Sequence, residues 1–239
     1  MKTFLCKPNH PPPTLIVCLD DVIYPVSMYR VGACRAGADL LRLMYGIDTY
    51  SRFMEIYRPG FEVEAVRAVI EEYLTSCDGK TLLKIAAAME SHNPRISAYE
   101  DAQETFPLLQ MFGVSLLLVG EGSRIGQRLI AERLRLHTTF RHMAYADPRI
   151  GSAGYQNAFF MLEAFSGLDR GNAVVICSNI TRVKELASGG WNVVYLRREG
   201  MPDVTLCGQG AERILTVVNL YALPEALGLV AWGGELQNK

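Results

Sequence analysis

Short apolar runs alternate with helix-length amphipathic segments along most of this chain. Five runs predict strands, at Thr14–Leu19, Ser115–Val119, Met143–Tyr145, Ala173–Cys177 and Asn192–Leu196. Each run is continuously apolar, which is typical of strands that are covered on both faces. Apolar residues at helical spacing predict helices at Gly122–Leu134, Tyr155–Phe165, Val183–Ser188 and Gly210–Tyr221. The alternation favours an α/β fold with a parallel sheet wrapped by helices.

A long insertion separates the first two predicted strands. It runs roughly from Ser27 to Pro94 and is helical in pattern over residues 31–46, 49–58, 63–77 and 80–91. The polar, turn-rich stretch SHNPRISAYED then leads back toward the second strand. We therefore expect an all-helical unit between the first strand and the rest of the sheet.

Composition narrows the class of partner. The 239 residues include 24 Lys and Arg and 25 Asp and Glu, so the net charge is close to zero. This balance gives no electrostatic reason to expect nucleic acid or an anionic membrane as a partner. No apolar run approaches the ~20 residues that a membrane span needs, and the N-terminal segment lacks the pattern of a signal peptide. Six scattered cysteines without a C-x-x-C pair indicate reduced thiols, and we expect a cytoplasmic location.

The segment LIVCLDDVIYP, Leu15 to Pro25, carries the most chemical information. An apolar strand runs into Cys18-Leu19-Asp20-Asp21-Val22-Ile23, which resembles the first motif of the haloacid dehalogenase (HAD) superfamily, D-x-D-G/D-T/V-hydrophobic. In that family the first Asp attacks phosphorus and the second, two residues on, transfers the leaving-group proton. The resemblance therefore places Cys18 at the nucleophile position and Asp20 at the proton-transfer position.

The resemblance also implies the architecture. It suggests a Rossmann-like, parallel five-stranded sheet in the order 3-2-1-4-5, with an inserted all-helical cap domain that closes over the site and selects the substrate. On this basis we expect an α/β core at residues 1–26 and 93–239 and a helical cap at residues 27–92.

The remaining family motifs align with unexpected residues. Gly120 stands at the hydroxyl position after the second strand, and Glu121 follows it. The Lys-Pro position of the family falls on Ala153-Gly154, with Arg149 the nearest cation and no Lys between Lys84 and Lys184. The metal-binding Asp falls on Cys177 or Ser178, and the second Asp falls near Arg182. The predicted binding cleft comprises Cys18, Asp20, Gly120, Glu121, Ala153, Cys177 and Ser178.

These residues predict a HAD-like protein without ordinary phosphatase chemistry. Magnesium usually takes one or two carboxylates from a protein, so we expect no magnesium site and no other cofactor. Our main hypothesis is a non-catalytic binding or regulatory pseudoenzyme. The alternative is a HAD-type hydrolase with an unorthodox nucleophile such as Cys18, activated by a lowered pKa. Since the first and fourth strands are neighbours in this fold, Cys18 and Cys177 are expected close together, either by coincidence or for a soft-metal or redox role.

The partners that we expect follow from the same hypothesis. They are a small-molecule ligand in the cleft between cap and core, a protein partner, or a second copy of the chain as a homodimer. We expect neither nucleic acid nor a membrane. A purely structural role as a subunit of a larger assembly is a weaker hypothesis.

Overall fold

A parallel sheet forms the centre of the molecule. The computed structural model of the chain describes residues 13–74, 77–201 and 206–229. Its six strands are arranged in the order β3-β2-β1-β4-β5-β6. Their bounds are Thr14–Cys18 for β1, Ser115–Glu121 for β2, His142–Ala146 for β3, Ala173–Cys177 for β4, Asn192–Leu196 for β5 and Ile214–Val217 for β6. The five predicted strands and their order are confirmed, and β6 is an addition.

The helix predicted over Gly210–Tyr221 is wrong. A short 3-10 turn at Ala211–Arg213 leads into β6, and a second 3-10 turn at Leu220–Ala222 precedes the short helix α9 (Leu223–Ala226). β6 pairs in parallel with β5, so that Ile214 lies opposite Val193. The open edge of β5 gives this short apolar run a backbone partner, and that tertiary pairing outweighs the weak helical pattern. The sheet therefore has six strands, not five.

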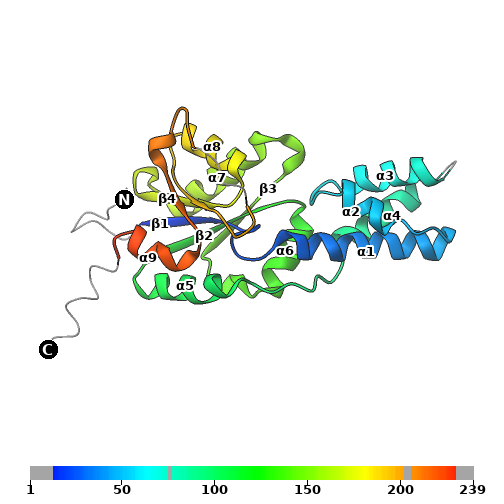
Figure 1. Ribbon diagram of the computed structural model, residues 1–239, viewed down its shortest axis with the longest axis horizontal. Helices are drawn as coiled ribbons and strands as arrows, with labels where there is room; N and C mark the ends of the chain where they lie inside the picture. The colour runs from blue at the N-terminus through cyan, green and yellow to red at the C-terminus, as the bar shows by residue number, and fades with distance from the viewer. Residues whose placement is uncertain (1–12, 75–76, 202–205, 230–239) are drawn as a thin grey trace.

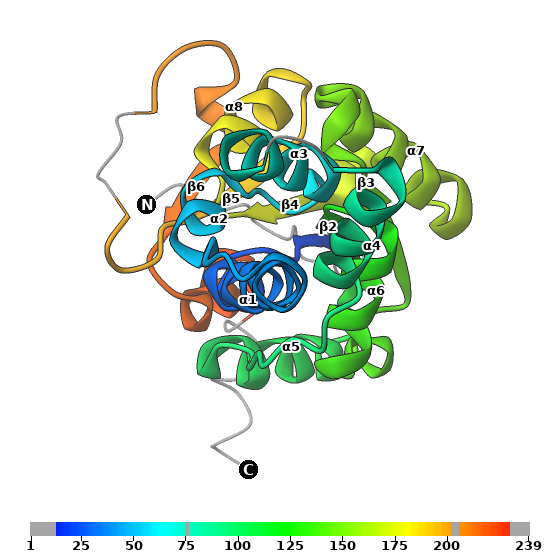
Figure 2. The ribbon, with the colours of Figure 1, turned by 90° about the vertical axis from the view of Figure 1, so that its right-hand side faces the viewer.

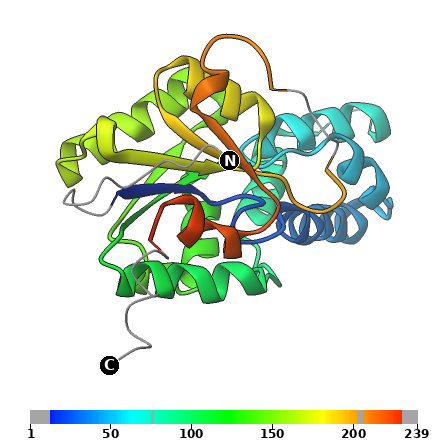
Figure 3. The ribbon, with the colours of Figure 1, turned by 60° about the vertical axis from the view of Figure 1, so that its left-hand side comes forward.

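Helices cover both faces of the sheet. α5 (Glu100–Met111), α6 (Arg124–Arg133) and α9 lie on one face, and α7 (Ser152–Ser166) and α8 (Ile180–Ser188) lie on the other, as Figures 1 and 3 show. The helices predicted around α6, α7 and α8 are confirmed, whereas α5 falls in a region where none was predicted. Coverage on both faces explains the continuous apolar runs, because Leu15, Ile16 and Val17 of β1 are completely buried.

Four helices form the inserted segment after β1. α1 (Val26–Tyr45), α2 (Tyr50–Ile56), α3 (Glu62–Tyr73) and α4 (Gly79–Glu90) pack against one another at the carboxyl end of the sheet, as seen from the side in Figure 1 and from the end in Figure 2. The fully buried side chains of Leu41, Phe53, Tyr57 and Met89 lie between them. We call this helical segment, residues 26–90, the cap; the exact division of the chain into domains stays a prediction.

Two glycines allow the cap to touch the core. Gly60, between α2 and α3, has a φ of 88°, and a Cβ atom there would lie 2.6 Å from Cγ of Pro148 and 3.2 Å from Cα of Gly122. A Cβ atom at Gly126 in α6 would lie 2.3 Å from the hydroxyl of Tyr29 in α1. The α2–α3 loop therefore lies directly against the turns that follow β2 and β3.

None of the described helices combines the length and hydropathy that a bilayer crossing requires. The cytoplasmic location stays a prediction.

The first testable prediction concerns the contact between cap and core. Gly60→Ala should lower the free energy of unfolding by more than Gly46→Ala, because a methyl group at Gly60 meets Pro148 and Gly122. Gly46 also has a positive φ, 73°, but a Cβ atom there would meet nothing within 4 Å. We expect about 1 kcal/mol for the control, from its left-handed backbone alone, and at least about 1 kcal/mol more for Gly60→Ala. Urea unfolding measures both, and equal losses would contradict a tight contact at Gly60.

Candidate functional site

Two thiols lie side by side where the central strands end. β1 pairs in parallel with β4, with Val17 opposite Ile176, so Cys18 and Cys177 are the next residues on neighbouring strands. Their thiols are hydrogen-bonded to each other, and both residues are buried. The hydrogen bond to Cys177 and burial raise the pKa of the Cys18 thiol well above its ordinary value, and the nearby carboxyls of Glu121 and Asp20 act in the same direction. The surroundings therefore disfavour a Cys18 thiolate.

Asp20 is held as a weak acid beside these thiols. The hydroxyl of Tyr24 donates a hydrogen bond to Oδ1 of Asp20 at 2.8 Å. Burial raises the pKa of Asp20 to about 7; the Tyr24 hydrogen bond opposes this shift, while the carboxyls of Asp21 and Glu121 add to it. Near neutral pH, this carboxyl therefore exists in both protonation states.

The turn after Asp20 is fixed by its own side chains. Asp21 has a φ of 57°, a left-handed conformation that Asp tolerates better than most residues. Its Oδ1 accepts a hydrogen bond from the backbone N–H of Val26 at 3.0 Å. The hydroxyl of Ser178, next to Cys177, donates to the carbonyl oxygen of Asp21 at 3.0 Å. Ser178 thus holds the loop rather than presenting its hydroxyl to a ligand.

Arg198 secures the same loop from the far side. Its guanidinium donates to the carbonyl oxygen of Val22 at 2.6 Å and to that of Asp21 at 3.3 Å. It also forms an ion pair with buried Asp101 at 2.6 Å and lies 3.8 Å from the ring centroid of Tyr99. Nothing in the family pattern singles out Arg198, and the sequence analysis missed it.

A second cluster, at the end of β2, contains Glu121, Tyr155 and Arg182; we call it the Glu121 cluster. The hydroxyl of Tyr155 donates to Oε2 of Glu121 at 3.1 Å. The guanidinium of Arg182 donates to Oε1 of Glu121 at 3.0 Å, and its Cζ lies 4.5 Å from the centroid of the Tyr155 ring. Both carboxylate oxygens of Glu121 are therefore used within the protein.

Tyr155 is buried among the strand-end groups. Burial raises the pKa of its hydroxyl well above the ordinary value, and the nearby thiols of Cys18 and Cys177 and the carboxyls of Glu121 and Asp20 raise it further. The Tyr155 side chain comes from the first turn of α7 and lies close to all four groups. It therefore lies at the strand ends, where its hydroxyl contacts Glu121.

Close backbone packing directs Tyr155 inward. A Cβ atom at Gly154 would lie 2.2 Å from the carbonyl oxygen of Asp147, so only glycine fits at the start of α7. A Cβ atom at Gly120 would lie 2.3 Å from Oε1 of Gln127, whose Nε2 donates to the carbonyl oxygen of Glu121 at 2.7 Å. Packing against Gln127 thus accounts for glycine at the position where the family carries a hydroxyl.

The structure brings most of the predicted cleft residues together. Cys18, Asp20, Glu121 and Cys177 form one neighbourhood, with Gly120 and Ser178 in its walls. Ala153, by contrast, lies on the exposed side of the α7 N-terminus.

Tyr155 takes the inward position instead of Ala153, and the sequence analysis missed it. Its position directly after Gly154, in the first turn of a predicted helix, is the sequence feature that could have identified Tyr155. Arg149 forms an exposed ion pair with Asp147 at 2.7 Å and does not take part in the cluster.

The strand-end residues do not fit a magnesium ion. Among the residues that the structure describes, no group of three or more His, Cys, Asp and Glu side chains is placed to hold a metal. Asp20 is surrounded by thiols and Tyr24, and Glu121 already accepts from Arg182 and Tyr155. Magnesium prefers a shell of oxygen ligands with unpaired carboxylates. The expectation that no cofactor binds stays a prediction.

A double-mutant cycle tests the Glu121 cluster. Glu121→Gln, Arg182→Gln and the double variant should give a coupling free energy of about 1–3 kcal/mol in unfolding experiments, because the pair is largely shielded from water. The matched control is the exposed pair Arg128–Glu132, 2.8 Å apart with 74% and 55% exposed side chains, for which we expect about 0.5 kcal/mol or less. Equal coupling in the two cycles would show that Glu121 and Arg182 do not form a shielded pair.

The raised pKa of Asp20 predicts a pH dependence of stability. In the unfolded chain Asp20 ionises near its ordinary value of 3.8, and in the folded protein it ionises at about 7. Its contribution is present in full below about pH 4 and is lost as the pH rises to about 7. The free energy of unfolding of the wild type relative to Asp20→Asn should thus fall by up to about 4 kcal/mol across this range.

Asp78, which caps α4, provides the contrast. Hydrogen bonds from Thr81 lower the pKa of Asp78, so its contribution should be lost as the pH falls. The contribution of Asp78 should be lost only below about pH 4, whereas that of Asp20 is lost between about pH 4 and about pH 7. Thermal or urea unfolding of Asp20→Asn and Asp78→Asn from about pH 2 to about pH 7 should therefore show opposite trends in these two windows. A pH-independent difference between the wild type and Asp20→Asn would refute a protonated Asp20 in the folded protein.

Comparisons with known proteins show which solved structures share this fold. No family model matches the sequence, and neither does any curated protein. Among solved structures, the 2-haloacid dehalogenase from Pseudomonas syringae pv. Tomato matches with a TM-score of 0.65 at 16% identity, over 92% of this chain and 99% of that one. CbbY from Rhodobacter sphaeroides, solved in complex with phosphate, matches with a TM-score of 0.64 at 12% identity, over 91% and 100% of the two chains.

A third solved structure is also similar over nearly the whole chain. The haloacid dehalogenase-like family hydrolase from Xanthomonas campestris matches with a TM-score of 0.62 at 16% identity, over 94% of this chain and 99% of that one. Such identities establish the fold alone, and they agree with the resemblance seen around Cys18 and Asp20. This chain has the fold of the haloacid dehalogenase-like hydrolases, with helices inserted after the first strand.

Proposed function

We propose that this chain is a non-catalytic binding protein built on the HAD-like fold. One observation carries the proposal: both carboxylate oxygens of Glu121, the last residue of β2, are engaged by Tyr155 and Arg182. Tyr155 and Arg182 satisfy both oxygens of Glu121 from within the protein. A substrate phosphate would have to displace Tyr155 and would then meet the carboxylate of Glu121.

The chemical groups beside this cluster support the same proposal. Phosphoryl transfer requires an activated nucleophile, donors for the phosphoryl oxygens and usually a divalent cation. Cys18 has a raised thiol pKa, and Arg182 already pairs with Glu121 and with Glu185, at 2.7 Å. The Cys18 thiol is therefore a poor nucleophile, and the Arg182 guanidinium is already paired with carboxylates rather than free to hold a phosphoryl oxygen.

A groove on the outer side of the cluster supports a role in binding. It has a volume of about 510 Å³ between α7 and α8, and its lining includes Tyr155, Arg182, Arg170 and Trp191. Cζ of Arg170 lies 5.0 Å from the centroid of the Trp191 ring. Arg170 pairs with Glu163, and Arg182 pairs with Glu121 and Glu185. The groove therefore offers aromatic rings and paired guanidinium groups, which suit a flat ligand without a large net charge. A ligand in this groove would contact the Glu121 cluster without entering the strand ends.

A hydrolase that uses Cys18 as its nucleophile is the second candidate. The matched structures include a hydrolase and a dehalogenase, which supports this candidate more directly than the first. Asp20, with a pKa of about 7, is suited to give a proton to a leaving group near neutral pH. The raised pKa of the Cys18 thiol and the burial of Tyr155 beside it favour the binding role.

Turnover assays separate the two candidates. We expect the purified protein, incubated with magnesium and a panel of phosphate esters, to release no more phosphate than its Cys18→Ala and Asp20→Ala variants. Cys34→Ala is the matched control, because Cys34 is another buried cysteine, in α1, and burial raises its thiol pKa to about 11. Wild-type turnover that is lost in Cys18→Ala or Asp20→Ala and kept in Cys34→Ala would overturn the binding proposal and establish the hydrolase.

A further inference from the structure

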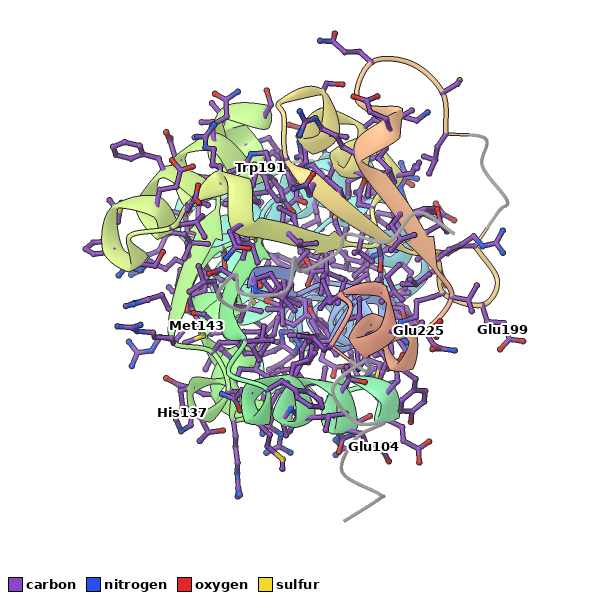
Figure 4. All side chains as sticks on the ribbon, turned by 90° about the vertical axis from the view of Figure 1, so that its left-hand side faces the viewer. Glu104, His137, Met143, Trp191, Glu199 and Glu225 are labelled. Atoms are coloured by element: carbon purple, nitrogen blue, oxygen red, sulfur yellow. The ribbon has the colours of Figure 1, made fainter. Side chains whose placement is uncertain are left out.

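Strand β3 forms one edge of the sheet and has no partner on its outer side among the described residues. It pairs only with β2, from Leu117 opposite His142 to Glu121 opposite Ala146. The strand sequence HMAYA contains no Lys and no Pro, the residues that commonly block the pairing of edge strands. Figure 4 shows Met143 of β3 on one side of the molecule and Glu199 and Glu225 on the opposite side. An outward row of backbone donors and acceptors is thus open to a further strand.

A groove lined by both apolar and charged residues accompanies this edge. It has a volume of about 410 Å³ between β3 and α7, with Ala144, Ala158 and Leu162 in its floor. Met161 and Phe165, one helical turn apart on α7, line the same groove and are 46% and 66% exposed. Nε2 of His142 is buried and has no hydrogen-bond partner among the described residues. Exposed apolar surface next to unpaired backbone is typical of a site for protein association.

Side chains along β3 alternate between the two faces of the sheet. Tyr145 lies near Arg124 and Arg128 of α6, whereas Ala144 and Ala146 are buried. Asp147 continues the extended backbone, with φ of −79° and ψ of 114°, and the N–H of Arg141 donates to the carbonyl oxygen of Leu116 at 3.0 Å. By this alternation, the side chains of residues 141, 143, 145 and 147 share the face on which Tyr145 lies.

We propose that a second copy of this chain pairs with β3 in an antiparallel arrangement about a twofold axis at Ala144. This register places Met143 opposite Tyr145 of the partner subunit and Arg141 opposite Asp147 of the partner subunit. A twofold axis produces each of these pairs twice, so the surface is complementary to itself. The sheets of the two copies then join into one.

Charge and size select this occupant and this register. Arg141 is exposed and forms no ion pair with a described residue, while the Asp147 carboxylate at the other end of the strand is 38% exposed and pairs with Arg149 at 2.7 Å, so Arg141 of the partner subunit would share it. Antiparallel pairing brings these opposite charges together at both ends of the interface. Ala144 at the axis is small enough for two copies of α7 to approach, so Met161 and Phe165 of both copies can bury their exposed area. Methionine beside tyrosine is a favourable cross-strand pair.

Sedimentation velocity over a wide range of protein concentration tests the proposal. We expect a concentration-dependent dimer. Arg141→Asp and Asp147→Arg should each weaken it by at least about tenfold, because each places two like-charged pairs across the axis. The double variant should restore it, because the pairs are only exchanged. Arg67→Asp, the same change of charge on the exposed side of α3, is the control and should leave the dimer unchanged.

Two further variants keep the test independent of these charges. Phe165→Glu should be monomeric in sedimentation velocity, and its circular dichroism spectrum should show that it is folded. Ala144→Cys in a Cys207→Ser background, which removes an exposed thiol, should form a disulfide between two copies under mild oxidation, since directly opposite residues of an antiparallel pair have Cα atoms about 4.5–5.5 Å apart, within the range that disulfides span. A monomeric wild type would overturn the proposal. So would a dimer unaffected by Phe165→Glu, or a double charge exchange that fails to restore association.

Discussion

The carboxylate of Glu121 determines what the strand ends of this protein can hold. A partly buried carboxylate needs partners, and here Tyr155 and Arg182 supply them from α7 and from α8. Meeting that requirement holds the Tyr155 ring at the strand ends and engages the guanidinium of Arg182, which lies 4.5 Å from the ring centroid. The carboxyl of Glu121 also adds to the raised pKa values of Cys18 and Asp20, whose main causes are the hydrogen bond to Cys177 and burial for the thiol and burial for the carboxyl.

The HAD-like architecture tolerates such a change because the fold and the chemistry depend on different atoms. The sheet is held by backbone pairing and by fully buried residues such as Leu15, Ile16 and Val17. The strand-end residues contribute little to that core, so they can change while the sheet and its helices persist. The fit of Gly60 against Pro148 shows that the cap still contacts the core in this protein.

The strands and most of the helices could be predicted from the sequence, and so could the neighbouring positions of Cys18 and Cys177, because these depend on local apolar runs and on strand order. β6 was missed because its conformation depends on the free edge of β5, which the local pattern does not contain. Tyr155 was missed for a similar reason. A contact at Gly154 with the backbone of Asp147 decides which residue of the first α7 turn faces inward. The function remains a proposal, because the fold is shared with hydrolases and the side chains alone distinguish the candidates.

A crystal structure of the protein soaked with magnesium and inorganic phosphate tests the central claim most directly. The account predicts that Tyr155 and Arg182 keep their hydrogen bonds to Glu121 and that neither ion binds at the ends of β1 and β4. A phosphate or a coordinated magnesium ion next to Cys18, with the Tyr155 side chain displaced, would contradict it.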